Sequence, residues 1–111
     1  MSRKVTIALD AMSGDRGPDV VVAAAFATLD KDDSVTLNLV GLPETLEAAR
    51  RSADGRYDGR LRFTPASEVV EMHEPPAEAV RRKKDSSLRV AIELVKSGEA
   101  DACVAGAATT T

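Results

Sequence analysis

Aromatic residues are scarce in this chain of 111 residues, which has no Trp, one Tyr (Tyr57) and two Phe (Phe26 and Phe63). Proteins that bind single-stranded nucleic acid use aromatic rings as stacking platforms, and nucleic-acid binders in general carry an excess of positive charge. Here 15 Lys and Arg stand against 18 Asp and Glu, which gives a net charge of −3. The composition therefore argues against nucleic acid as a partner.

Cysteine, histidine and long apolar runs are also rare. The single cysteine, Cys103, excludes an internal disulfide framework and a multi-cysteine zinc site, and we expect it to pack in the core. The single histidine, His73, has no second His or Cys at ligand spacing, so we interpret it as a surface residue and expect no metal site. No stretch reaches the roughly 20 apolar residues of a membrane span, and no signal peptide is recognisable. We expect a cytoplasmic protein.

Apolar residues follow strand and helix periods in alternation. Strand patterns occur at residues 5–9, 35–41, 61–64 and 102–105, and helical patterns at residues 18–29, 43–53, 76–84 and 87–97. Residues 66–74 are interpreted mostly as a loop, and the last predicted strand leads into a loop at residues 105–111, which in a parallel sheet should lead into another helix. Strands that alternate with helices predict βαβ units, a parallel sheet and right-handed crossovers, here in one domain with an aliphatic core.

Two glycine-containing loops follow predicted strands, and ligands of open parallel sheets bind beyond the carboxyl ends of strands where the strand order switches. Residues 10–17 lead into a helix, whose N-terminus attracts anions. The aspartates Asp10 and Asp15 oppose anion binding, and the loop matches neither the Walker A nor the G-x-G-x-x-G pattern, so a purely structural turn is the alternative. The second loop, residues 105–111, combines Gly106 with three threonines.

A third candidate lies directly before the helix predicted at residues 87–97. Ser86 and Ser87 follow Asp85, and these residue types accept hydrogen bonds from the free N–H groups of a helix start, so an N-cap is the simpler interpretation. The alternative is that the two hydroxyls and the helix N-terminus bind phosphate. The adjacent basic run is either a solvated helix face or a docking surface for an acidic partner. It consists of Arg81, Arg82, Lys83 and Lys84.

Taken in order, these residues resemble one bacterial enzyme family, the phosphate acyltransferases. Residues 10–18 read D-A-M-S-G-D-R-G-P and resemble the family's D-x-M-G-G-D-x-G-P opening. Residues 82–91 read R-K-K-D-S-S-L-R-V-A and are similar to its R-x-K-x-S-S-M-R-V-A segment. The resemblance covers essentially the whole chain. There are two departures: Ser13 stands where the family has glycine, and residues 105–111 lack the Asn of the family's S-A-G-N-T-G-A.

The resemblance implies that residues 1–111 are a single N-terminal α/β segment of a longer enzyme. The implied fold is a parallel-sheet three-layer sandwich of the isocitrate and isopropylmalate dehydrogenase type, incomplete in this chain. The implied reaction transfers a fatty acyl group from acyl carrier protein to inorganic phosphate and gives acyl phosphate for phospholipid synthesis, without a cofactor. A homodimer, with peripheral membrane contact in the full-length enzyme, is also implied.

Site residues follow from the resemblance and the loop positions, although no catalytic residue is assigned. The residues expected to bind phosphate or substrate are Asp10, Ser13, Gly14, Asp15, Gly17, Ser86, Ser87 and Gly106. Those expected to contact the acidic carrier protein are Arg81, Arg82, Lys83 and Lys84. We expect a third of such an enzyme to be inactive by itself.

Two other classes of protein are considered. A phospho-receiver module requires an acceptor Asp at the end of its third strand, where this chain has Thr64 and Pro65, and a Lys after a fifth strand that is not predicted. We therefore exclude that class. The remaining alternative is a truncated non-catalytic α/β fragment that only folds or self-associates through strand edges and helix faces left without neighbours.

Overall fold

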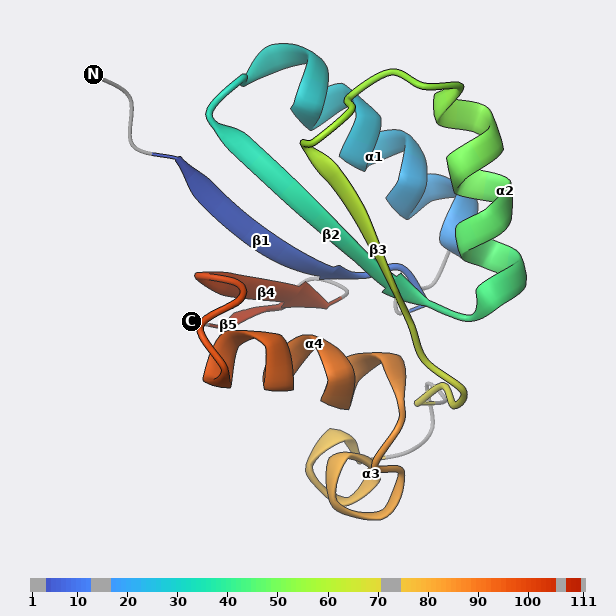
Figure 1. Cartoon of the computed structure of the whole chain (residues 1–111). Coiled ribbons are helices and arrows are strands. Elements are labelled where there is room, and N and C mark those ends of the chain that lie inside the picture. Colours follow the sequence, from blue (N-terminus) through green and yellow to red (C-terminus); the bar gives the residue numbers. More distant parts are fainter. Residues whose placement is uncertain (1–3, 13–16, 71–74, 106–107, 111) are drawn as a thin grey trace.

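Helices and strands alternate along the chain and build one twisted sheet (Figure 1). The computed structural model describes residues 4–12, 17–70, 75–105 and 108–110. Its strands are β1 (Val5–Asp10), β2 (Val35–Gly41), β3 (Leu61–Pro65), β4 (Ala102–Ala105) and β5 (Ala108–Thr110). Its helices are α1 (Pro18–Lys31), α2 (Pro43–Ala53), α3 (Pro76–Arg82) and α4 (Ser87–Lys96). Each predicted strand and helix is therefore present, with small differences at the ends.

The strand order is β3-β2-β1-β4-β5, and the pairs among the first four of these are parallel, as predicted. β5 was not predicted: residues 108–110, which were interpreted as part of a loop, form a strand antiparallel to β4 with Cys103 opposite Thr110. Only residues 106 and 107 separate β4 from β5, whereas a parallel neighbour needs a crossover of about a dozen residues. A short strand therefore stands in the segment that was interpreted as a loop.

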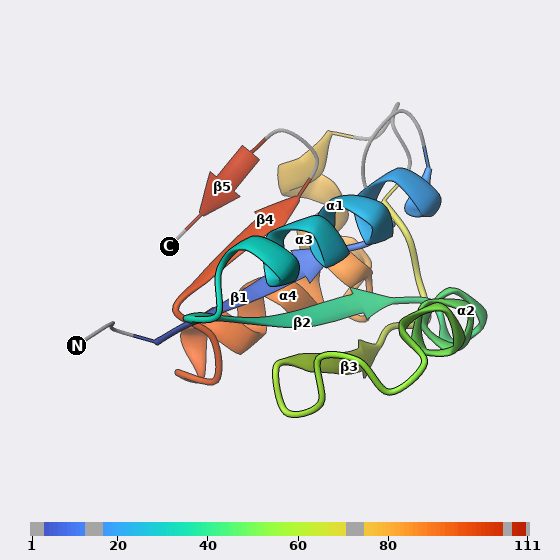
Figure 2. The same cartoon turned by 90° about the horizontal axis from the view of Figure 1, so that it is seen from above.

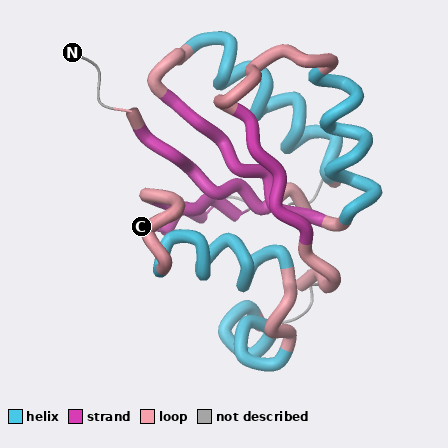
Figure 3. The backbone as a smooth tube through the Cα atoms, viewed as in Figure 1, coloured by secondary structure: helices cyan, strands magenta, loops and turns pink. Residues whose placement is uncertain are grey.

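Helices cover both faces of the sheet, which gives three layers (Figures 1 and 2). On one face α1 packs on β2, and α2 packs on β2 and β3; on the other face α4 packs on β1, β2 and β4. The chain winds from β1 to β3 through α1 and α2, then returns through α3 and α4 to β4, beside β1 (Figure 3). The direction of winding therefore changes between β1 and β4.

The core is aliphatic on both faces of the sheet, as the composition predicts. Leu29, Leu37 and Leu39 belong to the cluster under α1 and α2, and each is at most 3% exposed. Val40 and Leu94 belong to the cluster under α4, together with the buried Cys103. The prediction that Cys103 packs in the core is confirmed. Burial of a Leu or Val side chain contributes about 1.5–3 kcal/mol, so these two clusters hold the helices against the sheet.

Proline and glycine set the helix ends that the sequence predicts. Pro18, Pro43 and Pro76 each stand in the first turn of a helix, where the absence of an N–H costs nothing. After α2 the chain turns at Asp54 and Gly55, both with positive φ. No helix among the described residues is both long and apolar enough to cross a bilayer.

Candidate functional site

The carboxyl ends of β1 to β4 lie at one edge of the sheet, which we call the carboxyl edge. Asp10, the last residue of β1, is paired in register with Ala105, the last residue of β4. The chain therefore leaves β1 and β4 at neighbouring positions, where the strand order switches, although residues 108–110 of the second candidate loop form β5. Four candidate residues in these loops lie outside the described residues: Ser13, Gly14, Asp15 and Gly106.

Asp10 and Gly17 flank the first loop and shape it. The Asp10 side chain is buried, and its Oδ1 accepts a hydrogen bond from the N–H of Met12 at 2.9 Å. Such a bond turns the chain as it leaves a strand. Gly17 caps the start of α1 with φ of +86°, a conformation that side-chain-bearing residues rarely adopt. Their contact with phosphate stays a prediction.

Ser86 is the N-cap of α4, as the simpler interpretation predicts. Its Oγ accepts a hydrogen bond from the N–H of Arg89 at 3.1 Å, and the residue has no exposed surface. This bond satisfies one of the N–H groups that a helix start leaves without an acceptor. The capping oxygen of Ser86 is thus already used within the protein.

Ser87 is different, because its side chain is buried without a partner. It is 1% exposed, and its Oγ has no hydrogen-bond partner in the described part of the chain. Its own N–H donates to the carbonyl oxygen of Glu68 at 3.0 Å, whereas for the N–H of Leu88 the structure records no acceptor among the described residues. A buried polar group left unpaired costs about 1–3 kcal/mol. The start of α4 therefore keeps a hydroxyl and an N–H as donors.

Hydrogen bonds fasten the start of α4 to the segment after β3. Oδ2 of Asp85 accepts from the N–H of Ser67 at 3.0 Å and from its hydroxyl at 2.7 Å. In return the N–H of Asp85 donates to Oε1 of Glu68 at 3.3 Å. Ser67 and Glu68 are not among the predicted site residues; the available signal was their position directly after a strand that ends at the carboxyl edge.

The basic run has two kinds of environment. Arg81 and Arg82 lie in the last turn of α3 and are exposed, as is Lys84. Lys83 is half-buried, and its Nζ donates to the carbonyl oxygen of Val69 at 2.9 Å. The solvated-face interpretation thus fits the three exposed residues, while Lys83 also has a structural bond. Contact of this run with a carrier protein stays a prediction.

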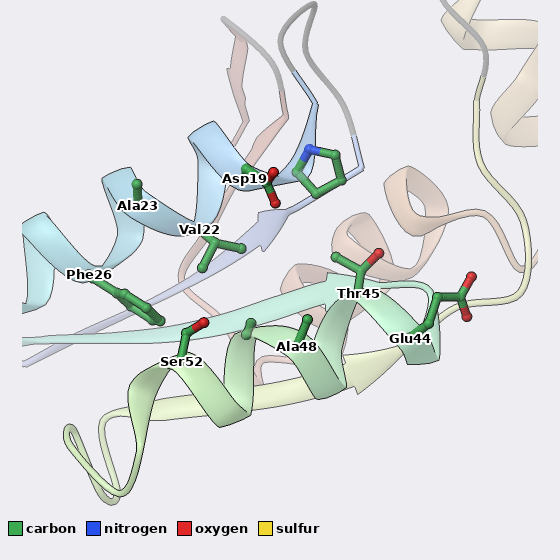
Figure 4. A pocket seen from close by; sticks show the side chains of 10 residues that line it. Asp19, Val22, Ala23, Phe26, Glu44, Thr45, Ala48 and Ser52 are labelled. Atoms are coloured by element: carbon green, nitrogen blue, oxygen red, sulfur yellow. The ribbon is translucent and has the colours of Figure 1, made fainter.

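A groove of about 480 Å³ lies between α1 and α2 and is shown in Figure 4. Val22 and Phe26 of α1 face Thr45 and Ala48 of α2 across it. Its charged residues are both acidic: Asp19 and Glu44, each in the first turn of its helix. Two carboxylates oppose the binding of phosphate, so this groove is not the anion site.

The described residues contain no cluster of three or more His, Cys, Asp or Glu side chains that could hold a metal ion. His73 lies outside the described residues. What remains is an open α/β sheet in which the ends of β1 and β4 lie side by side at the switch point, and in which a buried serine lies at the start of α4, beside the segment that follows β3. This arrangement belongs to the class of open α/β domains, in which ligands commonly bind at the carboxyl edge.

Comparison with known proteins specifies the family within that class. A family model described as "Fatty acid synthesis protein" matches residues 5–111, and the chain belongs to this family. It is 57% identical over 99 residues to the phosphate acyltransferase of Methylococcus capsulatus, and 54% identical over 104 residues to that of Alkalilimnicola ehrlichii. The phosphate acyltransferase of Halorhodospira halophila is 48% identical over 104 residues.

These alignments cover 89%, 94% and 94% of this chain, but only 29%, 30% and 30% of the respective relatives. The chain thus spans somewhat less than a third of the length of the relatives it matches. The family is described by a role in fatty-acid synthesis, and these relatives are named as phosphate acyltransferases.

Proposed function

We propose that this chain is the N-terminal segment of an enzyme that transfers a fatty acyl group from acyl carrier protein to inorganic phosphate. The product, acyl phosphate, would serve phospholipid synthesis. Membership of the family and the name of the relatives support an acyltransferase. The single structural observation that carries the phosphate part is the unpaired, buried hydroxyl of Ser87 at the start of α4.

In this reaction an oxygen of phosphate attacks the carbonyl carbon of the thioester. A C–O bond forms, the C–S bond breaks, and the carrier protein leaves with its sulfur as thiol or thiolate. Phosphate is itself the nucleophile, so the protein needs no covalent nucleophile. Its tasks are to take phosphate out of water, to hold it against the carbonyl, and to stabilise the developing oxyanion.

The start of α4 suits the first of these tasks. A phosphate oxygen would accept hydrogen bonds from the Ser87 hydroxyl and the Leu88 N–H, and the partial positive charge of the helix terminus favours an anion there. Because the Ser87 hydroxyl has no exposed area, contact with phosphate requires a local shift at the start of α4. Ser86 would position this turn through its capping bond, and Asp10 and Gly17 would shape the loop on the β1 side.

The proposal extends to the parts that the relatives have beyond the matched 29–30% of their length. We place there the rest of a dehydrogenase-type three-layer sandwich, the contacts of a homodimer and the elements for peripheral contact with a membrane. We propose that the whole enzyme works in the cytoplasm and that residues 1–111 supply one wall of its phosphate site.

The proposal is tested by titrating the chain with inorganic phosphate while recording backbone amide NMR shifts. We expect saturable shifts at Gly17, Ser86, Ser87 and Leu88, and none at Gly98, which follows the opposite end of α4. Ser87→Ala should weaken binding at least several-fold. If a folded chain gives no saturable shift, or if Gly98 shifts as much as Ser87, the phosphate site at α4 is wrong and the non-catalytic alternative is favoured.

The reaction itself needs a separate measurement. A protein of the length of the relatives that carries residues 1–111 at its N-terminus should form acyl phosphate from acylated carrier protein and phosphate. Ser87→Ala should lower this rate, mainly through weaker use of phosphate. Absence of acyl phosphate from a folded, phosphate-binding protein would show that the acyl-transfer part of the proposal is wrong.

A further inference from the structure

A short pairing of two backbone segments joins the residues after β3 to the turn before α4. Glu68 forms an isolated parallel bridge with Ser86, and the N–H of Ser87 donates to the carbonyl oxygen of Glu68 at 3.0 Å. The carbonyl oxygen of Asp85 accepts from the N–H of Ser67 at 3.1 Å and from the N–H of Glu68 at 3.2 Å. The paired segments, which we call the α4 clamp, are residues 67–68 and 85–87.

The side chain of Asp85 closes the α4 clamp. Its Oδ2 accepts from the N–H of Ser67 at 3.0 Å and from the hydroxyl of Ser67 at 2.7 Å. The N–H of Asp85 donates to Oε1 of Glu68 at 3.3 Å. Because a pairing as short as this one is marginal by itself, its position depends on these side-chain bonds.

The α4 clamp determines which donors the start of the helix keeps. The N–H of Ser87 is taken by the carbonyl oxygen of Glu68. The N–H of Arg89 is taken by the capping oxygen of Ser86. The Ser87 hydroxyl and the Leu88 N–H are left for an anion, and they come from adjacent residues. Two donors cannot engage every oxygen of phosphate, so an oxygen stays free to act as the nucleophile.

We propose that Asp85 is a positioning residue of the phosphate site, and the inference rests on the proposed function for the phosphate. Its carboxylate holds the α4 clamp and so keeps the Ser87 hydroxyl and the Leu88 N–H at one place on the carboxyl edge. The clamp fixes the backbone of residues 85–87, so the shift that phosphate binding requires falls on the Ser87 side chain. The carboxylate itself does not contact phosphate, because like charges repel.

The test compares two substitutions of Asp85 that remove the same charge. Asp85→Asn keeps an oxygen that accepts from Ser67, whereas Asp85→Ala does not, so the difference between the two variants isolates the clamp. Asp85→Ala should bind inorganic phosphate about two- to tenfold more weakly than Asp85→Asn, which corresponds to the net contribution of one hydrogen bond to the binding-competent arrangement. Amide NMR shifts of Leu88 during a phosphate titration measure both affinities.

Asp101 supplies a matched control at the edge of the sheet opposite the carboxyl edge. It lies between α4 and β4, is exposed like Asp85, and its Oδ2 accepts from the N–H of Thr6 at 2.9 Å. Asp101→Ala and Asp101→Asn should bind phosphate equally well. Ser67→Ala removes the hydroxyl donor alone and should weaken phosphate binding by a smaller factor than Asp85→Ala. It keeps the test decisive if Asp85→Ala does not fold.

Three outcomes would overturn the inference. Equal phosphate affinity of Asp85→Ala and Asp85→Asn would mean that Asp85 contributes to stability alone. Tighter binding by Asp85→Ala would mean that the clamp holds the site closed. A difference between the two Asp101 variants as large as that between the Asp85 variants would mean that any loosening of α4 weakens binding.

The rate of acyl phosphate formation gives a second readout that a loss of stability alone would not change in this way. In a folded protein of the length of the relatives, Asp85→Ala should raise the KM for phosphate relative to Asp85→Asn and leave kcat unchanged. Phosphate binding by the unaltered chain, with no difference between the two variants, refutes the role of Asp85 alone. Absence of phosphate binding from the unaltered, folded chain refutes the phosphate site of the proposed function.

Discussion

Ser67 and Asp85 are 18 residues apart in the chain, yet a single carboxylate oxygen of Asp85 accepts hydrogen bonds from both the N–H and the hydroxyl of Ser67. The pair joins the segment that follows β3 to the residue directly before the N-cap of α4. The position of the Ser86–Ser87 turn at the carboxyl edge therefore depends on an element that is distant in sequence. α4 is held in place in two ways: by this pair at its start and by its apolar contacts with β1 and β4.

We expect Asp85→Ala to lower the free energy of unfolding by about 1 kcal/mol. A hydrogen bond to a charged group contributes about 1.5–3 kcal/mol, and the exposure of this pair to water reduces that value. The measurement is urea unfolding followed by circular dichroism. Asp33→Ala, in the exposed turn between α1 and β2, is the matched control and should change stability little. Equal effects of the two substitutions would mean that the Ser67–Asp85 pair contributes nothing.

The neighbouring serines of α4 should respond to removal of the hydroxyl with opposite signs. Ser86→Ala removes the N-cap and should cost about 1 kcal/mol of stability. Ser87→Ala removes a buried hydroxyl that has no partner among the described residues, so stability should stay the same or rise. Urea unfolding of both variants gives the comparison. A loss of stability in the Ser87 variant as large as in the Ser86 variant would show that the Ser87 hydroxyl has a partner in solution.

Much of this fold is predictable from sequence because strong local signals coincide. Pro18 and Pro43 mark helix starts, Gly98 marks the end of α4, and alternating apolar residues mark β1 and β2. β5 lacks such a signal: it is a three-residue strand whose existence depends on a reversal after β4 and on pairing with that strand. Pairing of this kind is a property of the tertiary structure.

The sequence predicts which residues are candidates for the site, but not which of their side chains are buried or what each one bonds to. In the sequence Ser86 and Ser87 stand as a pair, and the spacing of the apolar residues that follow predicts the buried stripe of the helix, which consists of Leu88, Ala91, Ile92 and Val95. In the structure the most buried line of α4 is instead Ser87, Ala91 and Leu94. Ala91 belongs to both lines, and Ile92 and Val95 also pack against the core, so the buried face of α4 extends beyond the predicted stripe to Ser87 and Leu94. Burial of the Ser87 hydroxyl depends on packing against the rest of the protein, which a periodicity argument does not resolve.

Tyr57 should titrate above its usual pKa. Its hydroxyl donates to Oδ1 of Asp30 at 2.7 Å, and this hydrogen bond raises the pKa of Tyr57 above 10.0, against the opposing charge of Arg56. The bond requires the protonated phenol. Its contribution to stability is therefore complete below the unfolded-state pKa of about 10 and is lost as the pH rises through the raised pKa of the folded state.

The chain has one tyrosine and no tryptophan, so phenolate absorbance during an alkaline titration reports on Tyr57 alone. Asp30→Asn keeps an acceptor but removes the negative charge and should move the midpoint back toward 10.0. Unfolded protein in denaturant supplies the reference. A native midpoint equal to that reference would mean that the hydroxyl does not bond to Asp30 in solution.

The carrier-protein proposal places the acidic partner on the exposed residues of the basic run. Arg81→Glu and Lys84→Glu should each weaken the binding of acyl carrier protein several-fold, with a larger effect at low salt, because exposed charges act mainly through screened attraction.

Lys83 is not used for this test, because its amine donates to the carbonyl oxygen of Val69 and its loss would disturb the loop after β3. Arg62→Glu, on the exposed side of β3 at the far edge of the sheet, reverses the same charge away from α3 and should leave affinity unchanged. Calorimetric titration at two salt concentrations measures these affinities. Equal effects of the Arg62 and Arg81 reversals would mean that the carrier protein responds to the net charge of the chain and has no docking surface at residues 81–84.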